Sequence, residues 1–173
     1  MPLSIKRIQG RDIGPLREMS VDFVRSLEID YPQIDETEID KHMLSVLANC
    51  NNEDCIYLIA YDGKKPVGFI LGYVGNKPYS RPSRVSVAEE LYVVPNKRGG
   101  KVGLRLMQEA AKIALQRGAE AFECIGTYND TIKRWEKLGF KPHTVYAHMD
   151  NSDFMKLVGK FVGKGSENEN QSV

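Results

Sequence analysis

The chain has 173 residues with 24 Lys and Arg against 23 Asp and Glu, so its formal net charge is +1. This balance excludes a strong overall attraction to nucleic acid or to an anionic membrane surface. Hydrophobic residues make up 42% of the chain, which excludes a disordered polypeptide and predicts one compact domain with a buried core. No apolar run approaches the roughly 20 residues that a bilayer span needs.

The N-terminal region and the cysteines bear on the compartment. Residues 1–10 mix charged and apolar side chains and contain no apolar h-region, so we expect no signal peptide. The three cysteines, Cys50, Cys55 and Cys124, are a small and odd set that fits a reducing cytosol. No second Cys or His pair lies near Cys50 and Cys55. We therefore expect a cytoplasmic protein without a metal site.

The first half of the chain predicts a strand, two helices and a β-hairpin. In order, these elements cover residues 4–8, 12–27, 36–47, 55–61 and 66–74. The helices follow from apolar residues at helical spacing, and the hairpin from the turn signal Asp62-Gly63-Lys64-Lys65. The side chains expected on the buried helix faces are Leu16, Met19, Phe23 and Leu27 in the first helix, and Ile39, Met43 and Leu47 in the second.

The second half predicts alternating strands and helices. In order, these elements are a strand over 85–94, a helix over 103–117, a strand over 122–126, a helix over 130–138 and a strand over 145–149. The stripe expected on the first of these helices is Leu104, Met107, Ala111 and Leu115, with Gly118 at its C-terminal cap. This order predicts an α/β (α+β) fold with a mixed, mostly antiparallel central sheet of about six to seven strands, flanked by helices on both faces.

The predicted domain covers residues 1–150. An amphipathic helix follows at 151–163, with Phe154, Leu157, Val158 and Phe161 on one side. This helix either covers part of the core or forms a homodimer contact. The polar, glycine-bearing residues 164–173 predict a disordered tail.

A glycine-rich turn lies between a Val-rich strand and the strongest predicted helix. It comprises Arg98, Gly99, Gly100, Lys101, Val102 and Gly103. The first amides of a helix have no intrahelical acceptor, and the helix dipole attracts anions there. Glycines let the backbone approach a ligand, while Lys97, Arg98 and Lys101 add positive charge. The pattern predicts a phosphate or pyrophosphate seat, although it is neither a Walker A motif nor a dinucleotide fingerprint.

This turn resembles the acetyl-CoA-binding motif of the GNAT superfamily, V-x-P-x-x-R/Q-G-x-G-x-G/A. The matching residues are Val93, Pro95, Arg98, Gly99 and Gly103. Gly100 and Lys101 depart from the motif, since the family usually has a variable residue followed by glycine there. A lysine Cβ at that position would lie near the pyrophosphate.

A second segment is similar to the family ending N-x-x-A-x-x-x-Y-E-K-L-G-F. It runs from Asn129 to Phe140, with Trp135 in the place of the usual tyrosine. The two motifs and the order of elements extend the resemblance over about residues 5–149. The resemblance implies the GNAT fold, acetyl-CoA as co-substrate and direct acetyl transfer to an amine in a ternary complex.

The resemblance also implies how the pantetheine arm binds. The arm would lie where the strand ending at Val94 splays from the strand over 122–126. Backbone groups of Val93 and Val94 would pair with its amides, and amides from Leu91 to Val93 would support the oxyanion. Asn129 would bond the lower arm, and Trp135 would pack against it.

An amine must lose a proton before it attacks, so we expect a carboxylate base at the cleft. Glu89 and Glu90 precede the cofactor strand, and strand alternation allows only one of them to face the cleft unless a bulge intervenes. We favour Glu90, which would share a face with Tyr92. Tyr128 is the candidate proton donor to the departing thiolate.

Two segments are candidates for the acceptor side. Residues 28–40 contain no basic residue and include Glu28, Asp30 and Tyr31. The negative charge of this segment would favour a cationic amine. The loop over 75–84 contributes Tyr79. A polyamine, an aminoglycoside, a lysine side chain and a protein N-terminus all fit. A catalytically weak acyl-CoA sensor and an interaction protein remain alternatives.

Overall fold

The computed structural model describes residues 2–27, 35–79 and 81–124, together with residues 133, 136, 137 and 139. The chain divides into two compact units, Met1–Tyr128 and Asn129–Val173. The architecture below is that of the first unit. The helices expected over 130–138 and 151–163, the strand expected over 145–149 and the expected tail lie wholly or mostly outside the described residues.

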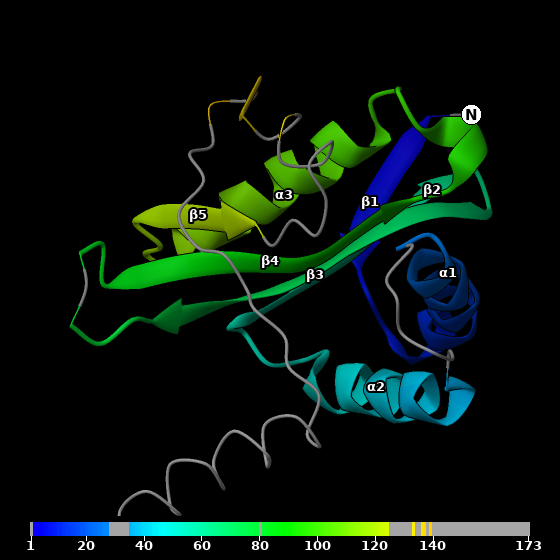
Figure 1. The fold of residues 1–173 in the computed structure, drawn as a ribbon, viewed down its shortest axis with the longest axis horizontal. Coiled ribbons are helices and arrows are strands. Elements are labelled where there is room, and N and C mark those ends of the chain that lie inside the picture. Colours follow the sequence, from blue (N-terminus) through cyan, green and yellow to red (C-terminus); the bar gives the residue numbers. More distant parts are fainter. Residues whose placement is uncertain are drawn as a thin grey trace, which may run out of the picture. The chain divides into compact units, whose positions relative to one another are not determined.

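The first unit is built on one mixed sheet in the order β1-β2-β3-β4-β5 (Figure 1). Its strands are β1 Leu3–Arg7, β2 Cys55–Asp62, β3 Lys65–Asn76, β4 Arg84–Val93 and β5 Ala121–Cys124. Neighbours from β1 to β4 pair antiparallel, and β4 pairs parallel with β5. The mixed, mostly antiparallel character was predicted correctly, while the described residues form five strands instead of six to seven.

Helices cover both faces of the sheet, as the element order predicted. Helices α1 Ile13–Arg25 and α2 Glu36–Asn49 lie on one face, and α3 Val102–Gln116 lies on the other (Figure 1). Short 3-10 helices, η1 Gly10–Asp12 and η2 Pro95–Lys97, precede α1 and α3. The side chain of Asp35 accepts from the amide of Thr37 and so caps the start of α2.

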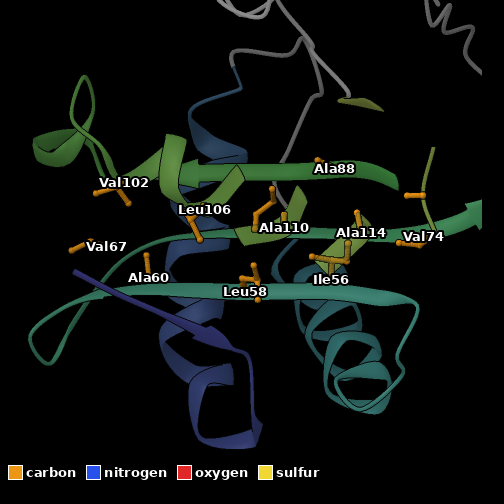
Figure 2. Close-up of a cluster of buried hydrophobic side chains, with 12 residues drawn as sticks. Ile56, Leu58, Ala60, Val67, Val74, Ala88, Val102, Leu106, Ala110 and Ala114 are labelled. Atoms are coloured by element: carbon orange, nitrogen blue, oxygen red, sulfur yellow. The ribbon is translucent and has the colours of Figure 1, made fainter. Parts of the chain in front are cut away.

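The core beneath α3 differs from the predicted stripe. The buried residues of α3 are Val102, Leu106, Ala110 and Ala114 (Figure 2), whereas Leu104 and Leu115 are exposed. Both sets recur at helical spacing, so periodicity alone did not separate them. Val102 and Leu106 pack closely over Gly68 of β3, where an added Cβ would lie 3.4 Å from each of them.

The core beneath α1 and α2 contains larger side chains than the core beneath α3. Leu16, Met19, Ile39 and Met43 are buried here as predicted, against sheet residues that include Phe69 and Tyr92. On α2 the third buried residue is Val46, and the expected Leu47 is 41% exposed. The two residues are adjacent on the helix, and the angle at which α2 lies on the sheet selects Val46.

Candidate active site

A β-bulge in β4 shapes the centre of the sheet. Leu71 of β3 pairs with Glu90, whereas the next residue, Gly72, pairs with Ala88. Glu89 is therefore an extra residue in β4 with no partner in β3. Among the described residues, β4 pairs with β5 up to Ala88 and Cys124, and Cys124 is the last described residue of that segment. The described residues place no strand against the edge of β4 from Glu89 to Val93.

The directions of the backbone N–H and C=O groups on this edge of β4 follow from the hydrogen bonds between β4 and β3 on its other edge. The amide of Val94 donates to the carbonyl of Val67 over 3.1 Å, and the Val94 carbonyl accepts from the amide of Lys97 over 2.9 Å. Backbone groups alternate in direction along a strand, so those of Leu91 and Val93 point away from β3. The amide of Val94 is thus used inside the protein, and the contact of Val94 with pantetheine stays a prediction.

The turn before α3 has the geometry of an anion seat. Gly99 adopts a φ of +76°, which lies in the left-handed region that favours glycine. Within residues 2–124, as far as they are described, the amides of residues 99–104 donate to no protein acceptor. No side chain caps the N-terminus of α3. Six amide donors are thus left at the positive end of a 15-residue helix.

The three cations of the turn are used differently. Lys97 Nζ lies 2.8 Å from Asp62 Oδ2, so part of the positive charge expected around the turn is paired within the protein. Arg98 Nε donates to the Val93 carbonyl over 2.9 Å, and its guanidinium lies 5.4 Å from the centre of the Tyr92 ring. Lys101 is exposed and forms no ion pair with any other described residue.

The candidate base Glu90 lies on the face covered by α1 and α2. Tyr57, Leu71 and Glu90 form one row across β2, β3 and β4, and Leu71 is buried on that face. Side chains directly opposite each other in antiparallel strands share a face. Glu90 Oε1 lies 2.9 Å from Nε2 of His42 in α2, which agrees with this placement. Tyr92 is buried on the same face, so Glu90 and Tyr92 share it as the alternation predicted.

Two residues of this cluster were not selected from the sequence. They are His42 in α2 and Tyr57 in β2. Burial raises the pKa of Tyr57, and a hydrogen bond with Cys55 and the charges of Glu89 and Glu90 raise it further, so its hydroxyl stays protonated. Only the pairing register brings Tyr57 to Glu90, and no sequence motif encodes that register.

Glu89 differs from its neighbour. Its side chain is exposed at the bulge, and partial desolvation together with the charge of Glu90 raises the pKa of Glu89, while His42 opposes the rise. At the end of β5, burial raises the pKa of the Cys124 thiol to about 12. A thiol that stays protonated at neutral pH is a poor nucleophile, which argues against an acetyl-cysteine intermediate.

The remaining predicted site residues are not brought to this cluster by the described structure. Tyr79 is fully exposed in the connection between β3 and β4, with a φ of 64°. The other six lie outside the described residues: Glu28, Asp30, Tyr31, Tyr128, Asn129 and Trp135. In the described part of the chain, no group of three or more His, Cys, Asp or Glu side chains is placed to hold a metal ion. None of the described helices has the length and apolarity needed to cross a membrane.

The described residues form a mixed sheet in which β4 is followed by a glycine-led turn and an uncapped helix. The family model of the Acetyltransferase (GNAT) family matches residues 20–140. The chain therefore belongs to the GNAT family of acetyltransferases.

Relatives and solved structures agree with this membership. An uncharacterized N-acetyltransferase from Archaeoglobus fulgidus is 25% identical over 134 residues, which cover 77% of this chain and 88% of that protein. A predicted acetyltransferase from Clostridium acetobutylicum, solved with acetyl-CoA, shares the fold with a TM-score of 0.72 at 15% identity over 88% of this chain and 98% of that one. An aminoglycoside acetyltransferase from an uncultured soil metagenomic sample shares the fold with a TM-score of 0.65 at 18% identity. The match covers 86% of this chain and 95% of that one.

Proposed function

We propose that the protein transfers an acetyl group from acetyl-CoA to a primary amine in a ternary complex. The observation that carries this proposal is the set of amides at residues 99–104 that donate to no described acceptor, at the start of the helix that follows β4. The amides would bind the pyrophosphate of coenzyme A, with Gly99, Gly100, Lys101, Val102 and Gly103 as the contacting backbone. Arg98 braces the turn through the Val93 carbonyl.

The edge of β4 from Glu89 to Val93 would take the pantetheine arm. Leu91 and Val93 present their backbone groups on this side, and Val94 does not present its amide. An arm lying along this edge would carry the thioester toward the bulge at Glu89, where an amide of the strand can stabilise the developing oxyanion. Asn129 and Trp135 remain proposed pantetheine contacts, as the family resemblance implies.

Glu90 is the proposed general base. An acceptor amine is protonated at neutral pH, so one proton must leave before its lone pair attacks the thioester carbonyl carbon. Glu90 accepts that proton, directly or through a water. The new C–N bond forms as the C–S bond breaks, and the coenzyme A thiolate leaves with the electron pair. Tyr128 is the proposed donor of a proton to that thiolate.

The acceptor is proposed to be a cationic amine. Glu89 and Glu90 place two carboxyl groups at the bulge, and residues 28–40 add further acidic side chains in the sequence. A negative site concentrates a cationic substrate and orients it. The likeness to an aminoglycoside acetyltransferase places aminoglycosides in the set to be tested, beside polyamines, lysine-containing peptides and free protein N-termini.

Turnover with a panel of amines tests the proposal directly. Acetyl-CoA is incubated with the protein and with spermidine, kanamycin, a lysine-containing peptide or a peptide with a free N-terminus, and released thiol is measured. We expect saturable thiol release with at least one amine and formation of the acetylated product by mass spectrometry. Calorimetric binding of coenzyme A without turnover on any amine would favour the acyl-CoA sensor, and no binding would contradict the phosphate seat.

Replacing Gly99 by alanine tests the turn itself. A Cβ at Gly99 meets nothing within 4 Å, so the cost comes only from the φ of +76° and should be about 1 kcal/mol in the free energy of unfolding. Gly99→Ala should also weaken the binding of coenzyme A, because a change of backbone conformation at residue 99 moves the donor amides. Urea unfolding and calorimetry measure the two effects.

Gly14→Ala is the matched control for that substitution. Gly14 lies in α1, where an added Cβ also meets nothing within 4 Å and φ is not positive. Alanine should stabilise this helix by about 0.5 kcal/mol and leave coenzyme A binding unchanged. Equal effects of the two substitutions would contradict the special role of Gly99.

A further inference from the structure

His42 of α2 contacts the proposed base directly. Its Nε2 lies 2.9 Å from Oε1 of Glu90, and the two side chains are 45% and 21% exposed. The contact joins the helix layer to the sheet at the β4 bulge, where the row Tyr57, Leu71 and Glu90 crosses the sheet. His42 is three residues after the buried Ile39 and one before the buried Met43, so the packing of α2 sets where its ring lies.

The chemistry of the contact constrains both partners. An ionised carboxylate can only accept hydrogen bonds, so Nε2 of His42 carries a proton whether the imidazole is neutral or charged. The bond uses Oε1 of Glu90 and leaves Oε2 to take a proton. The second ring nitrogen, Nδ1, is the atom at which His42 gains or loses its charge.

The surroundings favour the charged imidazole. The hydrogen bond with Glu90 raises the pKa of His42, partial burial opposes it, and the charges of Glu90 and Glu89 add to the rise. The other titratable groups of the packed elements include Tyr57 and Cys55 in β2, Tyr73 in β3 and Tyr92 in β4. Those of α1 and α2 are Arg17, Glu18, Asp22, Arg25, Glu36, Glu38, Asp40 and Lys41. Among them, Arg17 pairs with Glu36 and Asp40, Arg25 with Asp22, and Lys41 with Glu38.

We propose that His42 is a positioning residue for Glu90: it holds Oε1 so that Oε2 accepts the proton of the amine, and the charge on His42 gates that step. An imidazolium beside the carboxylate opposes proton uptake by the carboxylate, and a neutral imidazole permits it while keeping the same hydrogen bond. The inference rests on the proposed acetyltransferase function, and it adds a residue from α2 to the site.

Substitutions at His42 and Glu90 test the positioning role. Gln in His42→Gln can donate to Glu90 but does not titrate, and His42→Ala removes the donor without harming the helix. On the amine that gives the fastest wild-type turnover, His42→Ala should lower kcat by about 10- to 100-fold, and His42→Gln should restore most of it. Lys41→Ala, on the same turn of α2, is the control and should keep wild-type kcat.

A double-mutant cycle then asks whether His42 acts through Glu90. In the Glu90→Gln background, His42→Ala should have little further effect, because the residue it positions is gone. Full additivity of the two substitutions would overturn the inference. So would His42→Ala with wild-type kcat. Failure of wild-type protein to acetylate any amine would instead overturn the proposed function on which the inference rests.

The pH dependence provides a readout that a merely structural role would not change. The wild-type log kcat should rise through the titration of His42, and His42→Gln should lack that inflection. Proton NMR of the free protein measures the same titration, because the chain has three histidines and His42→Gln assigns one signal. The signal of His42 should titrate above the reference value of about 6.5 and shift to lower pH in Glu90→Gln. An unshifted His42 titration would overturn the inference.

Discussion

Glu90→Gln is expected to lower kcat by about 10²- to 10⁴-fold while the affinity for acetyl-CoA stays unchanged. Glutamine keeps the shape of the side chain and can still accept from His42, but it cannot take a proton from the ammonium of the acceptor. Steady-state turnover with a panel amine and calorimetry with coenzyme A measure the two quantities separately. The loss should shrink as pH rises toward the pKa of the amine, because more of the amine is then already neutral.

Glu89→Gln is the matched control for this prediction. Glu89 is the neighbouring carboxylate at the bulge, but it has no partner in β3 and its side chain is exposed. We expect a change confined mainly to KM for a cationic amine, because Glu89 contributes charge and not the proton transfer. If Glu89→Gln loses kcat and Glu90→Gln keeps it, the two carboxylates have been assigned in the wrong order.

Gly72→Ala is expected to lower the free energy of unfolding by about 3 kcal/mol and to abolish most of the activity in the protein that remains folded. A Cβ on Gly72 would lie 2.2 Å from the carbonyl oxygen of Val87 and 3.1 Å from Cα of Ala88. Both are backbone atoms of β4, so no side-chain rotation relieves the clash. The strands must separate at the bulge that positions Glu90.

Gly75→Ala separates this effect from the loss of a strand glycine in general. Its Cβ would meet only the ring of Tyr73, at 3.1 and 3.3 Å, and that ring is partly exposed and can turn away. We expect a change in unfolding free energy below about 1 kcal/mol and near wild-type turnover. Urea unfolding of both variants checks the difference. Equal destabilisation would mean that the bulge is not closely packed at Gly72.

Local signals predicted most of the described elements well. The hairpin around Gly63, the glycine with positive φ after α3 at Gly118 and the turn before α3 all appear where turn and cap residues indicated. These features depend on residues within a few positions of each other, so the sequence contains the whole of the physics that forms them. The buried faces of α2 and α3 were predicted less well, since Leu47, Leu104 and Leu115 are exposed.

The sequence by itself determined the glycine turn before α3 and the GNAT resemblance. Free amides, a left-handed glycine and a following helix arise within residues 98–103, and no distant partner is needed to form them. The two carboxylates Glu89 and Glu90 could also be named in advance, because they are adjacent in the chain.

Only the tertiary structure decided which groups act together. The bulge at Glu89 depends on the register with β3, the row from Tyr57 to Glu90 crosses three strands, and His42 comes from a helix 48 positions earlier in the numbering. Lys97 likewise pairs with Asp62, the last residue of β2. Such pairings depend on the register of the strands and on how the helices pack on the sheet. Both are determined by the burial of side chains throughout the core, and not by residues that are close in sequence.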